Sequence, residues 1–116
     1  MRMYLKAEYR AAINLFRKGG SKEAIAAIDA INAYNADISR RVYNSIKEGF
    51  GAYQTTAHGA RMIIIHQSSR RPDAIQISHF NKINGEWIAF SHGEATSPEE
   101  LKNHLMPGRY VNLRRV

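Results

Sequence analysis

The first half of the chain repeats apolar residues at the spacing of an amphipathic helix. Residues 4–18 place apolar side chains every three or four positions, which predicts a helix that ends at Gly19-Gly20. A second stripe with the same period extends over residues 22–48. Asn and Asp at positions 32–37 favour turns over helix interiors, so we favour two collinear helices with a kink or break there. One unbroken helix is the alternative.

From Gly49 onward the pattern changes to short β-prone runs separated by turns. Residues 52–57 and 61–67 each predict a strand. The second run has four consecutive apolar residues, Met62–Ile65, which is typical of a central strand covered on both faces. The last residues, 109–116, predict a final strand or a basic tail.

A β-hairpin is predicted over residues 73–92. The chain turns at Asn84-Gly85, because both residues tolerate a positive φ angle. A two-residue turn pairs Ile83 with Glu86, Asn81 with Ile88, His79 with Phe90 and Ile77 with His92. His79 and His92 then share one face of the hairpin. The other face carries Phe80, Lys82 and Trp87.

A short helix is predicted after the hairpin, within residues 96–105. Ser97 has the side chain of an N-cap, Pro98 suits the first helical position, and Glu100 completes a capping box. The element order predicts an α+β domain: an N-terminal helical hairpin of two or three helices packs on an antiparallel β-meander of four to five strands, with a short C-terminal helix. We expect a single domain, 1–116, with a helical half over 1–48 and a β-rich half over 49–116.

Composition narrows the classes of partner. The chain has 17 Lys and Arg against 10 Asp and Glu, a net charge of +7, which is typical of proteins that bind polyanions. Cysteine is absent, which excludes disulfides, thiolate metal sites and a cysteine nucleophile. The apolar runs are too short to cross a bilayer, and charges interrupt the N-terminus where a signal peptide would need an apolar core. We therefore expect a cytoplasmic protein without membrane partners.

The residues expected to contact nucleic acid combine guanidinium or ammonium groups for phosphate with aromatic rings for unpaired bases. They are Arg61, Arg70, Arg71, Lys82, Arg109, Arg114, Arg115, Phe80 and Trp87. If helices cover the Phe80 and Trp87 face, these two rings are core residues instead.

Histidines supply a second candidate site. His66, His79 and His92 lie in or beside predicted strands and could provide the acid and base of phosphodiester cleavage. Their spacing matches no metal-binding signature, so we predict neither a metal nor a cofactor. The alternative is that each is a structural or surface residue.

The leading hypothesis is a small basic cytosolic protein that binds nucleic acid, RNA or DNA, or regulates such a process, without catalytic activity. One alternative is a metal-independent ribonuclease that uses the strand histidines. A second alternative is a protein-directed inhibitor or adaptor of the mobile-element type, acting on a host complex. The sequence leaves the oligomeric state open.

Overall fold

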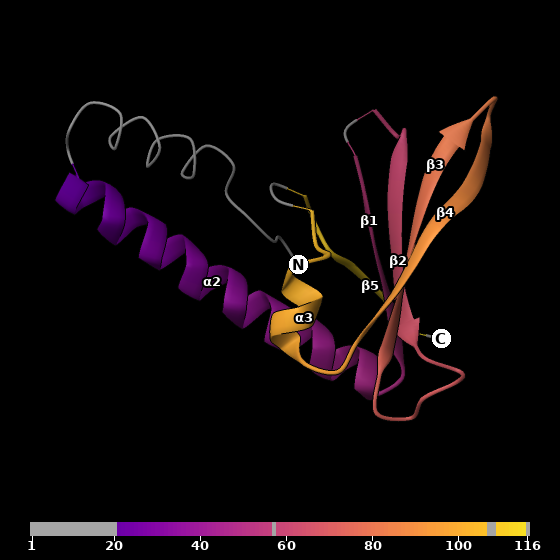
Figure 1. Cartoon of the computed structure of the whole chain (residues 1–116), viewed down its shortest axis with the longest axis horizontal. Coiled ribbons are helices and arrows are strands. Elements are labelled where there is room, and N and C mark those ends of the chain that lie inside the picture. Colours follow the sequence, from indigo (N-terminus) through magenta and orange to yellow (C-terminus); the bar gives the residue numbers. More distant parts are fainter. Residues whose placement is uncertain (1–20, 57, 107–108, 116) are drawn as a thin grey trace.

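A long helix leads into a five-stranded antiparallel sheet in the computed structural model, which describes residues 21–56, 58–106 and 109–115 (Figure 1). The elements in chain order are α2 (Ser21–Lys47), β1 (Phe50–Thr55), β2 (Arg61–Gln67), β3 (Ile75–Ile83), β4 (Glu86–Ala95), α3 (Pro98–Lys102) and β5 (Asn112–Arg115). This order confirms the α+β class. The helix predicted over residues 4–18, which would form the first arm of the helical hairpin, lies outside the described residues.

The helix α2 is continuous, so the predicted break at residues 32–37 was wrong. Asp37 forms ion pairs with Arg40 and Arg41, three and four residues later, instead of capping a new helix. The Ser39 hydroxyl donates a hydrogen bond to the backbone carbonyl of Asn35 at 2.8 Å. These polar side chains therefore find partners within one helix. Neither of the described helices has the combined length and apolar character of a membrane span.

The sheet has the strand order β4-β3-β2-β1-β5, and every neighbouring pair is antiparallel. Four strands follow one another as the predicted meander, and the chain then returns to add β5 beside β1. The strand predicted over residues 61–67 has those bounds, and it is the central strand.

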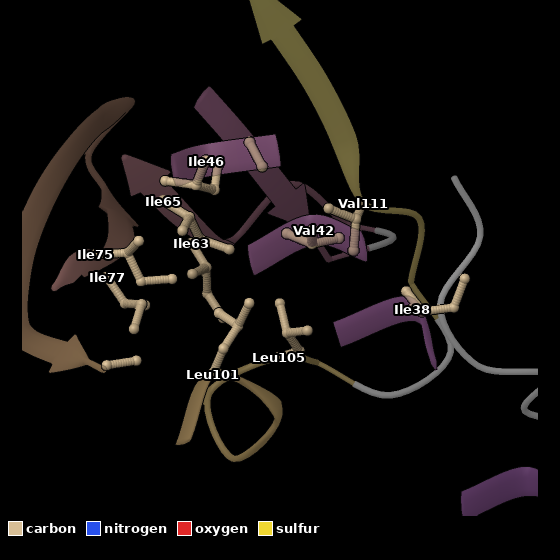
Figure 2. Close-up of a cluster of buried hydrophobic side chains, with 12 residues drawn as sticks. Ile38, Val42, Ile46, Ile63, Ile65, Ile75, Ile77, Leu101, Leu105 and Val111 are labelled. Carbon is tan, nitrogen blue, oxygen red and sulfur yellow. The ribbon is translucent and has the colours of Figure 1, made fainter. Parts of the chain in front are cut away.

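The core lies between one face of the sheet and the two helices, and Figure 2 shows isoleucines from the strands pointing towards α2. Alternate residues of β2 and β3 face the helices, and four isoleucines among them are fully buried: Ile63, Ile65, Ile75 and Ile77. Burial of such a side chain contributes roughly 1.5–3 kcal/mol. The buried apolar cluster consists of Ile38, Val42, Ile46, Ala52, Ile63, Ile65, Ile75, Ile77, Ala95, Leu101, Leu105 and Val111.

The opposite face of the sheet is not covered by α2 or α3 (Figure 1). In β2, Ile63 and Ile65 are fully buried, whereas Met62 and Ile64 are only partly buried on the other side. The prediction that Met62–Ile65 is covered on both faces was therefore wrong for the described part of the chain. Its apolar run instead reflects packing against neighbouring side chains on an open surface.

The predicted turn is confirmed, but a β-bulge changes the register of the hairpin beyond it. Asn84 and Gly85 have φ angles of 53° and 81°, as a two-residue hairpin turn requires. The pairs of Ile83 with Glu86 and Asn81 with Ile88 are as predicted.

Farther from the turn, Phe80 lies opposite Ala89 and His79 lies opposite Ser91, so Phe90 is the extra residue. The predicted pairs of His79 with Phe90 and of Ile77 with His92 were therefore wrong. His92 lies opposite Ser78, on the other face from His79.

The short helix α3 begins as predicted. The Ser97 hydroxyl accepts a hydrogen bond from the Glu100 N–H at 3.2 Å, and Pro98 is the first helical residue. The Glu100 carboxylate accepts from the N–H of Thr96, one residue before the cap, at 2.9 Å. These contacts fix the point at which the chain leaves β4 and begins α3.

The segment between α3 and β5 is held by the buried amide of Gln54 in β1. Its oxygen accepts from the Met106 N–H at 2.7 Å, and its nitrogen donates to the carbonyl of Met106 at 3.1 Å. A fully buried amide needs such partners, because losing them costs about 1–3 kcal/mol.

Candidate nucleic-acid interface

The sheet face away from α2 and α3, called the open face below, carries three aromatic side chains. Strand alternation places Tyr53 of β1, Phe80 of β3 and Trp87 of β4 on it. Trp87 is 37% exposed, and Tyr53 and Phe80 are partly buried. Rings held upright on a strand surface in this way can stack against flat ligands.

Cations lie over two of these rings. The Lys82 ammonium lies 5.6 Å from the centre of the Trp87 ring, and the Arg114 guanidinium lies 4.8 Å from that of Tyr53. Both distances allow cation–π attraction, worth about 0.5–1 kcal/mol at exposed sites. Each pair brings a phosphate-binding group and a stacking surface together.

Among the described strand residues, the open face carries one carboxylate, and this carboxylate is paired. Glu94 in β4 accepts a hydrogen bond from Arg71 at 3.2 Å. Arg71 also donates to Asp73 at 3.2 Å, and this hydrogen bond holds the pKa of Asp73 below its ordinary value. Arg71 is thus engaged by two carboxylates, which leaves the positive charge of Lys82 and Arg114 uncompensated on this face.

The other predicted basic residues are dispersed. Arg70 lies in the turn before β3, where it lines a hollow with His92 and Glu94 at one end of the open face. Arg61 lies on the helix-facing side of β2, because it alternates with Met62.

Arg109 lies in the segment before β5. Its backbone carbonyl accepts a hydrogen bond from the side-chain nitrogen of Gln54 at 3.4 Å. Arg115 lies at the sheet edge with its guanidinium 5.6 Å from the centre of the Phe50 ring. The structure therefore brings Phe80, Lys82, Trp87 and Arg114 together on one face and places Arg61, Arg71 and Arg109 elsewhere.

The three predicted histidines do not form one cluster. His66 and His92 lie on the open face, where the Nδ1 atom of His66 contacts the Gln67 carbonyl at 2.7 Å and that of His92 contacts the Ser78 hydroxyl at 3.0 Å. His79 lies on the helix-facing side and is only 8% exposed.

Sequence reasoning missed the histidine that His79 does contact. The Nε2 atom of His79 lies 3.3 Å from Nδ1 of His104, and its Nδ1 atom lies 3.5 Å from Arg61. The two histidines are 25 residues apart in the chain, so no local pattern connects them. Glycine at position 93 of β4 was the one local sign that a ring packs there, because a Cβ atom at this position would lie 2.8 Å from the His104 ring.

The His79 environment favours the neutral imidazole. Burial lowers its pKa most, and the positive charges of His104 and Arg61 lower it further. Acid–base cleavage of a phosphodiester needs two groups on opposite sides of the phosphate. Here the nitrogen atoms of His79 and His104 face each other instead, an arrangement that favours a structural role.

The described residues contain no group of three or more His, Asp or Glu side chains arranged to hold a metal ion. No family model matches the chain, and neither the curated proteins nor the solved structures contain a significant match to it.

Proposed function

We propose that the protein is a non-catalytic nucleic-acid-binding protein that holds single-stranded RNA or DNA on the open face of its sheet. One observation carries the proposal: the open face presents Tyr53, Phe80 and Trp87, with Arg114 and Lys82 lying over two of these rings. Large aromatic side chains are usually buried, so three on an uncovered face favour a surface that receives a ligand.

The chemistry of the open face suits a flexible polyanion with flat groups. Rings stack with unpaired bases, a contact worth about 1–3 kcal/mol per base. Lysine and arginine neutralise phosphates and release counterions. Glu94, the one carboxylate among the described strand residues of this face, already pairs with Arg71, so it adds little repulsion.

A single strand fits better than a duplex. Bases in a duplex are stacked on each other and cannot meet Phe80 or Trp87 face to face, whereas unpaired bases can. We therefore expect preference for unpaired strands and weak dependence on base sequence.

The test is a titration of the full chain into fluorescently labelled single-stranded RNA and DNA, followed by anisotropy. Trp87→Ala should weaken binding about 5- to 100-fold, because it removes one stacking ring. The matched control is Ile88→Ala: Ile88 is the next residue, 44% exposed, and faces the other side of β4. Its affinity should equal that of the unsubstituted protein.

Salt dependence separates the role of charge from that of stacking. Affinity should fall steeply with rising salt, and Arg114→Ala should reduce the slope by about one counterion. Arg61→Ala, on the helix-facing side, should leave the slope unchanged. Absence of binding to both oligonucleotides at about 50 mM salt, or equal losses in Trp87→Ala and Ile88→Ala, would overturn the proposal. Shortened RNA products in EDTA would favour the ribonuclease alternative instead.

A further inference from the structure

A hollow of about 350 Å³ lies on the open face over β5, β1 and β2. Its sides are formed by Tyr53, Met62, Ile64 and His66 and by the basic residues Arg114 and Arg115. Gly51 of β1 also lines it, and pairs with Arg114 of β5. The hollow is therefore apolar on its walls and cationic at its rim.

Gly51 has no conformational reason to be glycine. Among the described glycines, only Gly49, Gly59 and Gly85 have positive φ angles, so the Gly51 backbone is one that any residue can adopt. Glycine inside a strand costs roughly 0.5–1 kcal/mol relative to alanine. The other strand glycine of the sheet, Gly93, is explained by the ring of His104 against it.

Gly51 lines the hollow on the open face without contributing a side chain to it. A side chain at this position would project between Arg114 and His66, into the hollow. Glycine within a strand often marks a place where a ligand approaches the backbone closely. The absence of a side chain here keeps the hollow open.

The lining selects the kind of group that can enter. Tyr53 and Ile64 offer aromatic and aliphatic surface to a flat apolar ring, and none of the described lining residues carries a carboxylate. The Arg114 guanidinium, which lies over the Tyr53 ring, suits a negatively charged group attached to that flat ring. A nucleotide, a flat base that carries a phosphate, combines both properties.

We propose that the hollow over Gly51 receives one unstacked base of the bound single strand, while Arg114 contacts the adjacent phosphate. The inference rests on the proposed function and assigns to it a defined base-binding subsite. Stacking at Phe80 and Trp87 then acts at a second position, on β3 and β4. A strand that follows the open face from β5 to β4 would use both.

The test is Gly51→Val in the full chain, measured by the same titration and by thermal unfolding. Valine suits a strand, so the variant should unfold at the same or a higher temperature, yet bind the oligonucleotide about tenfold or more weakly because its side chain fills the hollow. Gly51→Ala, a smaller change, should give an intermediate loss. The control is Thr55→Val, a β-branched change on the same face of β1 outside the hollow, and it should bind normally.

The outcomes distinguish this inference from the proposed function. If Gly51→Val or Gly51→Ala is folded and binds as tightly as the unsubstituted protein while Trp87→Ala is impaired, the subsite is refuted and the proposed function stands. If the unsubstituted protein binds no oligonucleotide, both fail. If Gly51→Val does not fold, Gly51→Ala alone decides: normal binding refutes the subsite and weakened binding supports it.

Discussion

Asn35 lies fully buried in α2, and neither atom of its side-chain amide has a hydrogen-bond partner among the described residues. An unpaired buried polar group loses its bonds to water without replacement, at a cost of about 1–3 kcal/mol. Asn35 lies within residues 32–37, where the sequence predicted a kink or break, but the helix continues through this segment.

We expect Asn35→Leu to raise the free energy of unfolding by about 1–3 kcal/mol, because leucine has a similar shape and no unsatisfied atoms. Urea denaturation measures this change. Asn32→Leu, an exposed substitution on the same helix, is the control and should change stability by less than about 0.5 kcal/mol. A loss of stability in Asn35→Leu would show that the amide has partners in solution.

His79 makes the stability of the fold depend on pH. Its pKa in the folded protein lies below the ordinary value of 6.5, mainly through burial and then through His104 and Arg61. Below pH 6.5 His79 is therefore protonated more readily in the unfolded chain than in the folded one. The free energy of unfolding falls as the pH falls from 6.5 towards the pKa of the folded state. Above pH 6.5 neutral His79 makes its full contribution to the free energy of unfolding.

Replacing His79 removes this titration. We expect the unsubstituted protein to lose more stability than His79→Phe between about pH 7.5 and pH 5.5, as measured by urea unfolding at each pH. Phenylalanine keeps a ring beside Phe90, which lies 5.9 Å from His79. His92→Phe, at an exposed histidine on the opposite face, should retain most of the pH dependence, because His92 contributes least to the lowered pKa of His79. Parallel pH profiles for all three proteins would contradict the assignment.

Among the elements, the β3–β4 hairpin shows both what local sequence predicts and where it fails. Asn84-Gly85 determines the turn through its own backbone preferences, so the turn and the pairs beside it were predictable. The bulge at Phe90 depends on contacts with residues distant in the chain: the ring lies beside His79 and under the Arg61 guanidinium, 5.8 Å from its centre. No pattern within β4 indicates these contacts.

The bulge gives β4 one residue without a partner on β3. Removing Phe90 makes the pairs of Phe80 with Ala89 and of His79 with Ser91 consecutive on both strands. Deletion of Phe90 should therefore leave the protein folded, with a loss below about 2 kcal/mol in thermal unfolding. Deletion of Ser78 from β3, where every residue is paired, should prevent folding, because it moves part of the strand to the wrong face. Similar behaviour of the two deletions would refute the assigned register.

At the scale of the whole molecule, the sequence predicted the composition of the layers but not their arrangement. The alternation of apolar residues indicated one antiparallel sheet with helices against it. The position of β5 beside β1 follows from pairing between segments about 60 residues apart, which local patterns do not specify. The face that the helices cover depends on packing as well, so the exposure of Phe80 and Trp87 could not be predicted.

The candidate interface was predictable only in part for the same reason. Phe80, Lys82 and Trp87 share a hairpin face, and the two-residue turn was enough to group them. Arg114 joins them only because β5 pairs with β1, and no local pattern indicated a role for Gly51. More than half of the net charge of +7 comes from residues 1–20, which hold five Lys or Arg and one Glu. The proposed binding by the described sheet therefore depends on where its aromatic and basic residues lie more than on excess charge.

The division of the sheet into a packed face and an open one has a consequence for how this protein can change over evolutionary time. Residues that maintain the fold and residues that would meet a ligand alternate along β1, β2 and the first half of β3. Point substitutions at every second position can therefore alter recognition while the core persists. Insertion or loss of one residue in a fully paired strand exchanges the two sets at once. We expect homologous chains to diverge with a period of two in these strands and to keep strand lengths constant, except at Phe90.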